Sequence, residues 1–151
     1  MSLTPVTLKS ISSIVEGEKN IVANLANITS LLFSEGDWHW VGFYVLDKDE
    51  DELVLGPFQG PVACTRLRRG KGVCAKAWEA GTTLLVKDVH EFDGHIACSS
   101  ATNSEVVVPI KVDGVVVGVL DIDSLEFDGF TSAEIDLLEE VVTIIEDIWK
   151  R

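Results

Sequence analysis

Cys98 lies in a segment of small and polar residues, 93–105, which reads DGHIACSSATNSE. A buried structural cysteine normally has apolar neighbours, among which it acts as a small hydrophobe. A cysteine among glycine, serine, asparagine and threonine is more accessible to solvent or to a substrate. In its thiolate form such a cysteine attacks electrophilic sulfur and can be oxidised to a sulfenic acid. The segment therefore predicts a reactive thiol.

Cys64 and Cys74 are the other two cysteines of the chain. In a redox cycle a second thiol approaches the sulfenic acid and resolves it as a disulfide. Either residue could do so, and two alternatives stay open. Both could simply fill the core. All three cysteines could also bind zinc together with His95, although the C-x₂₋₄-C pairs of structural zinc sites are absent. Otherwise His90 and His95 are interpreted as loop histidines.

Three acidic residues follow Cys98 on predicted strands. Glu105 opens one strand, and Asp121 and Asp123 lie two apart on another, so those two side chains point to the same face. One interpretation is a strand that ends in solvent. The other is an acidic pocket for a small cation, such as an ammonium group or a metal ion. If Glu105 joins the pair, crowding raises the carboxyl pKa values, and one group stays protonated as a proton donor.

The elements that position these residues follow from hydrophobic periodicity and turn residues. Helical spacing runs from residue 6 to about 34 with a break at Gly17, and a short helix is predicted over 70–81. A last helix covers 131–150, where Thr131 and Glu134 have the spacing of a capping box. Strands are predicted over 38–47, 53–58, 63–67 and 83–89, and over two runs within 105–124 that flank an Asp113-Gly114 turn.

This order of elements predicts an α+β fold, with a central, mostly antiparallel sheet and with the N- and C-terminal helices packed together on one face. The 151 residues fit a single domain, 1–151, that can bury a core without disulfides. Pro109 indicates a sheet edge or a bulge. The apolar face of the last helix is wide enough to cover a sheet and contact a partner helix, which leaves a homodimer open.

The charge balance limits the classes of partner. Twelve basic and 25 acidic residues give a net charge of −13 at pH 7, which argues against a nucleic acid or an anionic membrane. No apolar run approaches the roughly 20 residues of a membrane span. The start of the chain, MSLTPVTLKS, lacks the features of a signal peptide. We therefore expect a cytoplasmic location, where cysteines stay reduced unless they take part in redox or metal chemistry.

The segments that carry these residues resemble a known family, the free methionine-(R)-sulfoxide reductases, which are built on a GAF domain. All three cysteines stand where the family has them, and the resemblance covers nearly the whole chain. Ser99 departs from the pattern, because members usually carry aspartate directly after the reactive cysteine. The similar segments are WVGFY (40–44), PVACTRLRRGKGVCAKAW (61–78), LVKDVHEFDGHIACSSATNSEVVVPI (85–110) and GVLDIDS (118–124).

The resemblance implies a GAF-like fold and the reduction of free methionine-(R)-sulfoxide to methionine, without a bound cofactor or metal. It implies Cys98 as the nucleophile, Cys64 as the resolving cysteine, and Cys74 as an alternative partner in disulfide exchange. Thioredoxin would then reduce the disulfide. The implied substrate-binding residues are Glu105, Asp121 and Asp123, for the amine and the sulfoxide oxygen, and Trp40 and Tyr44, for the methyl-sulfinyl group.

Trp40 and Tyr44 are four apart on one predicted strand and so share a face, and core packing accounts for them equally well. The main alternative function is a non-enzymatic GAF module that binds a small ligand or mediates dimerisation. Such a module shares the fold but needs no paired cysteines.

Overall fold

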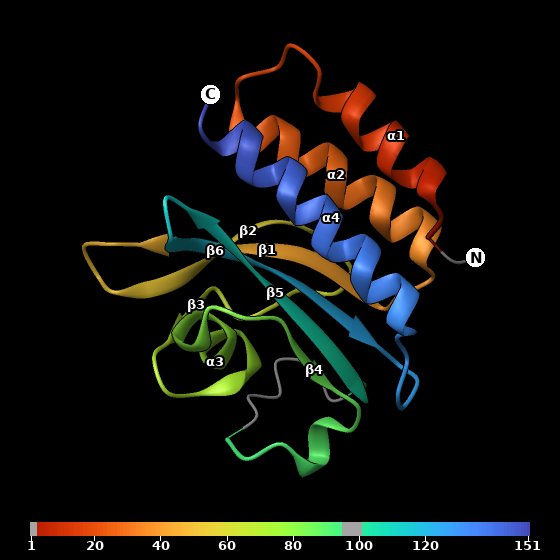
Figure 1. Cartoon of the computed structure of the whole chain (residues 1–151). Helices are drawn as coiled ribbons and strands as arrows, with labels where there is room; N and C mark the ends of the chain where they lie inside the picture. Colours follow the sequence, from red (N-terminus) through yellow and green to blue (C-terminus); the bar gives the residue numbers. More distant parts are fainter. Residues whose placement is uncertain (1–2, 95–100) are drawn as a thin grey trace.

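The computed structural model describes residues 3–94 and 101–151. Within them, four α-helices and one short 3₁₀-helix surround a six-stranded sheet (Figure 1). The helices are α1 Pro5–Val15, α2 Ile21–Gly36, α3 Gly72–Ala80, the 3₁₀-helix η1 Val89–Glu91, and α4 Ser132–Trp149. The strands are β1 Trp40–Asp47, β2 Glu52–Gln59, β3 Arg66–Arg68, β4 Leu84–Val86, β5 Ser104–Val112 and β6 Val115–Ser124.

The sheet has the strand order β3-β2-β1-β6-β5-β4, and every neighbouring pair is antiparallel. Helices α1, α2 and α4 lie together on one face, and α3 covers the other (Figure 1). The predicted α+β fold, with N- and C-terminal helices on one face of an antiparallel sheet, is therefore confirmed. None of the helices in the described part of the chain is both long and apolar enough to cross a bilayer.

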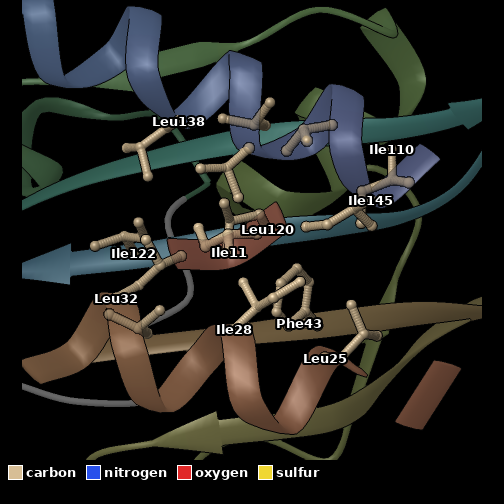
Figure 2. Close-up of a cluster of buried hydrophobic side chains, with 14 of the residues drawn as sticks. Ile11, Leu25, Ile28, Leu32, Phe43, Ile110, Leu120, Ile122, Leu138 and Ile145 are labelled. Carbon is tan, nitrogen blue, oxygen red and sulfur yellow. The ribbon is translucent and has the colours of Figure 1, made fainter. Parts of the chain in front are cut away.

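The main core lies between the three terminal helices and the sheet. Figure 2 shows Ile11 of α1, Ile28 of α2 and Leu138 of α4 meeting the sheet, and all three side chains are fully buried. Each such side chain contributes roughly 1.5–3 kcal/mol when it leaves water. The strand residues that complete this layer include Val41, Phe43, Val106, Ile110, Leu120 and Ile122.

The helix ends follow the sequence signals. Gly17 has a φ of +77° and lies in the break between α1 and α2, as predicted. The capping box of α4 is formed, because the backbone N–H of Glu134 donates to Thr131 Oγ1 at 3.1 Å and the backbone N–H of Thr131 donates to Glu134 Oε1 at 3.0 Å. Helix α4 packs on β5 and also contacts α1 and α2, so part of its wide apolar face is used within the chain.

The β5–β6 hairpin contains a bulge that sets its register. Its turn is the predicted Asp113-Gly114 pair, with φ values of +53° and +79°. The pairing passes from Lys111–Val116 to Ile110–Gly118 and skips Val117. Pro109 lies beside this bulge, and β4 pairs only with residues 105–107, so the β4 side of Pro109 is open. Both features that Pro109 indicated are therefore present.

Three predicted strands are shorter in the structure, and the first, predicted over 38–47, loses only its first two residues as β1. The strand predicted over 63–67 is β3, and it begins only at Arg66, where Val54 of β2 becomes its partner. Cys64 therefore lies in the loop between β2 and β3. The strand predicted over 83–89 is β4 and ends at Val86, after which the chain enters η1.

Candidate active site

A pocket lies on the α3 face of the sheet, where strands β1, β6 and β5 run side by side under the start of α3. Its cavity of about 50 Å³ has room for several water molecules or for part of a small ligand. One wall is acidic, and another is aromatic. The lining residues are Trp40, Tyr44, Pro61, Val62, Ala63, Leu67, Lys71, Gly72, Val73, Cys74, Thr102, Glu105, Asp121 and Asp123.

The acidic wall consists of Glu105, Asp121 and Asp123, which the sequence placed on two different strands. Glu105 of β5 is directly paired with Asp123 of β6, and Asp121 lies two residues before Asp123 on the same face. Glu105 and Asp121 are each only 6% exposed. The side chain of Glu105 hydrogen-bonds both aspartates. The structure therefore brings all three predicted carboxyl groups together and does not support a strand that ends in solvent.

Burial changes the protonation of this wall. Removal from water raises the pKa of Glu105 to about 8, and the charge of Asp123 adds to the effect. Removal from water also raises the pKa of Asp123 well above its usual range, with a further contribution from the charge of Asp121. The pocket therefore holds protons at neutral pH, and it can release them when a cation arrives.

Thr102 completes this wall beside Asp123. Oδ1 of Asp123 and Oγ1 of Thr102 are both buried, and the Thr102 side chain lies close enough to Asp123 to oppose the rise in the pKa of that carboxyl group. Both groups are placed to hydrogen-bond a polar ligand that enters the pocket. Thr102 was not among the predicted residues, because a single threonine in a polar loop carries no sequence signal.

The aromatic wall is formed by Trp40 and Tyr44 of β1. Their rings stack with centroids 6.0 Å apart, and Trp40 also stacks on Phe58 at 5.4 Å. Gly42 lies between them on the same face, and a Cβ there would come within 2.5 Å of both the Trp40 ring and Phe58. The missing side chain thus lets the rings close over the strand. The Tyr44 hydroxyl donates to the carbonyl oxygen of Cys64 at 2.8 Å.

Two of the three cysteines lie in or beside the pocket, in different states. Cys64 is half-buried and disulfide-bonded. Cys74, in the first turn of α3, is a buried free thiol that is hydrogen-bonded to Asp121. Burial raises the pKa of the Cys74 thiol well above its usual range, and the charges of Asp121 and Glu105 add to this. Cys74 is therefore a neutral thiol at the pocket wall.

The predicted nucleophile, Cys98, lies outside the described residues, and so does His95. The zinc interpretation depended on both together with Cys64 and Cys74, and a cysteine in a disulfide has no thiolate to offer a metal. His90 is exposed on η1, where its Nε2 lies 3.0 Å from Oδ1 of Asn103, which fits the loop histidine that we expected.

A different set of groups has the spacing of metal ligands. The Sγ of Cys74 and one carboxyl oxygen each of Glu105 and Asp121 lie within 4.8 Å of one another. Metal ligands must be deprotonated, whereas burial favours the protonated forms of Cys74 and Glu105. The arrangement therefore favours a protonated, hydrogen-bonded cluster that can exchange a proton for an organic cation.

Comparison with known proteins identifies the fold. The sequence pattern of the GAF domain family matches residues 21–149. The chain is 46% identical to GAF domain-containing protein A of Dictyostelium discoideum, over 93% of this chain and 88% of that protein. It is 44% identical to the free methionine-R-sulfoxide reductase of Escherichia coli, over 91% of this chain and 82% of the relative.

A solved structure agrees with these relatives. The crystal structure of the free methionine-R-sulfoxide reductase of Neisseria meningitidis, in complex with its substrate, superposes with a TM-score of 0.94 and 44% identity, over 99% of this chain and 93% of that one. The family match over residues 21–149 shows that the chain is a GAF domain. Within that class, the chain belongs to the family of free methionine-(R)-sulfoxide reductases.

Proposed function

We propose that this protein reduces free methionine-(R)-sulfoxide to methionine through a cysteine sulfenic acid and an intramolecular disulfide. The observation that carries the proposal is the buried carboxyl cluster of Glu105, Asp121 and Asp123, which shares a pocket with the aromatic wall. The relatives named as free methionine-R-sulfoxide reductases support it. In the sequence, Cys98 stands seven residues before Glu105 of β5.

The carboxyl cluster provides selectivity for a free amino acid. A free methionine sulfoxide has an ammonium group, which a peptide-bound residue lacks. Asp121 and Asp123 bind this group, and Asp123 releases its proton to water as the ion pair forms. A substrate without the charge would leave the buried carboxyl groups without that partner, which is unfavourable. Trp40 and Tyr44 contact the methyl-sulfinyl end of the substrate.

The first chemical step uses Cys98 and Glu105. The Cys98 thiolate attacks the sulfoxide sulfur while Glu105, protonated at neutral pH because its pKa is raised to about 8, donates a proton to the sulfoxide oxygen. The oxygen passes to Cys98, which becomes a sulfenic acid, and the sulfoxide gains two electrons and leaves as methionine. Bulk water then reprotonates Glu105.

The second step removes the sulfenic acid. The Cys64 thiol attacks the Cys98 sulfur, a disulfide forms, and the hydroxyl leaves as water. Cys64 is disulfide-bonded and follows Ala63 of the pocket lining, which supports this role. Cys74 is buried as a free thiol, which supports a secondary role in disulfide exchange. The dithiol of thioredoxin then reduces the disulfide and is itself oxidised.

This cycle consumes reducing equivalents, so we place the protein in the cytoplasm, where thioredoxin is kept reduced. No bound cofactor or metal takes part in any step. A homodimer through the exposed part of α4 stays a prediction.

The test is turnover with purified protein, free methionine-(R)-sulfoxide and a thioredoxin system. We expect methionine to accumulate over many turnovers and Cys98→Ser to abolish it, with the neighbouring Ser99→Ala as a matched control that keeps it. Binding of the sulfoxide without any methionine would instead identify a non-enzymatic sensor module. Normal rates in Cys98→Ser would show that the nucleophile is another residue.

A further inference from the structure

The loop between β2 and β3, residues 60–65, carries Cys64 and is here called the resolving loop. Its first part is exposed, with Val62 87% exposed, whereas Ala63 and Cys64 pack against the apolar cluster on the α3 face, and the Leu55 N–H donates to the carbonyl of Thr65 at 2.9 Å. Two aromatic side chains of β1 also bind the backbone of the loop. The indole N–H of Trp40 donates to the carbonyl of Pro61 at 3.0 Å, and the Tyr44 hydroxyl donates to the carbonyl of Cys64 at 2.8 Å.

Gly60 lets the resolving loop pass close to β1, where Trp40 and Tyr44 donate their hydrogen bonds to its backbone. Gly60, at its start, has a φ of +125°, which side chains other than glycine rarely adopt. A Cβ at Gly60 would lie 2.7 Å from the carbonyl oxygen of His39 and 2.8 Å from Cδ1 of Trp40. The loop therefore crosses β1 at a distance that only glycine permits. This close approach brings the two carbonyls within reach of the aromatic donors.

The Tyr44 hydroxyl stays protonated and donates its hydrogen bond to the Cys64 carbonyl. Burial raises the pKa of Tyr44 well above its ordinary value, and the charge of Asp121 adds to the effect. The hydroxyl therefore keeps its proton over the whole working range of pH and always remains a donor. Its acceptor is the backbone of the cysteine that forms the disulfide, so loss of the bond frees the backbone at that residue.

We propose that Tyr44 is a positioning residue for disulfide formation, which holds Cys64 through its own carbonyl oxygen at the place where its sulfur reaches Cys98. This inference rests on the proposed function and deepens it. Trp40 performs the same task at Pro61, three residues earlier. Residues 61–63 of the resolving loop line the substrate pocket, but in the reduction of the sulfoxide the Cys64 sulfur forms no bond. In the next step it does, because the Cys64 S–H and the Cys98 S–OH must meet to form the disulfide and release water.

A Tyr44→Phe variant keeps the buried ring but loses the hydroxyl, so it tests the formation of the disulfide apart from the reduction of the sulfoxide. In a single turnover without reductant, methionine formation is timed separately from disulfide formation, because Tyr44 also lines the substrate pocket and only the second step reports on the positioning role. Formation of the disulfide should slow about fivefold, the effect of one neutral hydrogen bond, so that more sulfenic acid is trapped by dimedone. Thr29→Val is the matched control, because it removes a buried hydroxyl-to-carbonyl bond of 2.6 Å in α2, on the other face of the sheet.

A second measurement requires no sulfoxide. Equilibration with dithiothreitol buffers gives the stability of the disulfide, and we expect Tyr44→Phe to shift this equilibrium about fivefold toward the dithiol. Trp40→Phe, which removes the other bond, should shift it in the same direction, and Thr29→Val should not. Wild-type rates of disulfide formation and an unchanged equilibrium in Tyr44→Phe would overturn the inference. If the wild-type protein forms no methionine but the equilibrium shifts as expected, the proposed function fails and the positioning role stands.

Discussion

Glu105 of β5 is directly paired with Asp123 of the neighbouring strand β6, because a bulge at Val117 shifts the register of the hairpin by one residue. At the turn, Val112 pairs with Val115, and an unbroken ladder from there would place Glu105 opposite Ile122. Directly opposed residues share a face, so Glu105 would then point toward the apolar core that Ile122 helps to form. The bulge instead places this carboxyl group in the pocket.

The protonated Glu105 predicts a pH profile for catalysis. In wild-type protein, kcat/KM should rise as the Cys98 thiolate forms and then fall above about pH 8, where Glu105 loses its proton. Glu105→Gln should reduce kcat by roughly 10²–10⁴-fold and remove the falling limb, because an amide donates a hydrogen bond but not a proton. Steady-state kinetics between pH 5 and about 9.5 check this. A falling limb that persists in Glu105→Gln would assign it to another group.

The same raised pKa predicts a pH dependence of stability. Between the ordinary glutamate value and about pH 8, the folded state keeps the Glu105 proton that the unfolded state loses, so the free energy of unfolding should fall as pH rises. Each unit of difference between the folded and unfolded pKa values corresponds to about 1.4 kcal/mol in the free energy of unfolding. Because Glu105 and Asp123 titrate together, this pH dependence belongs to the pair and not to Glu105 alone. Urea unfolding of Glu105→Gln should show a flatter pH dependence than wild type. The exposed Glu140→Gln serves as the control and should follow the wild-type curve.

Removal of one charge from the ammonium site should weaken binding more than chemistry. Asp121→Asn keeps the shape of the side chain, and we expect the KM for free methionine-(R)-sulfoxide to rise about 10- to 100-fold, the range for a hydrogen bond to a charged group. The kcat at saturation should change much less. The exposed Asp136→Asn is the matched control. A KM that stays at the wild-type value would remove Asp121 from the binding site.

The roles of the two remaining cysteines can be separated by turnover number. Cys64→Ser should yield a single methionine per protein molecule and then stop, because its sulfenic acid cannot be converted into the disulfide that thioredoxin reduces. Cys74→Ser should continue over many turnovers. The methionine yield per molecule, with and without thioredoxin, measures both. Sustained turnover in Cys64→Ser would transfer the resolving role to Cys74.

Much of the fold and part of the site could be predicted from local patterns. Asp121 and Asp123 had to share a face because side chains alternate along a strand. Trp40 and Tyr44 had to share a face for the same reason, and they do. The Asp113-Gly114 turn and the capping box of α4 are local signals as well, and both are formed. Each of these features depends on residues close together in the chain.

The remaining features depend on contacts between distant residues. The pairing of Glu105 with Asp123 depends on the bulge. Pro109 indicated a bulge, but it did not show in which direction the register of the two strands would shift. Cys64 lies in a loop rather than in the predicted strand, and Trp40 and Tyr44 of the distant β1 donate hydrogen bonds to the backbone of that loop. Periodicity cannot reveal such bonds, because an aromatic residue on a strand has the same pattern whether or not its polar atom reaches a carbonyl.

The most direct test of the whole account compares two substrates in one assay. Purified protein with a thioredoxin system is given free methionine-(R)-sulfoxide or the same sulfoxide within a short peptide, at equal concentration. We predict that the free form is reduced at least about 100-fold faster, because only its ammonium group can pair with the buried carboxyl groups of the pocket. Equal rates on the two substrates would contradict the account, since the carboxyl cluster would then play no part in substrate recognition.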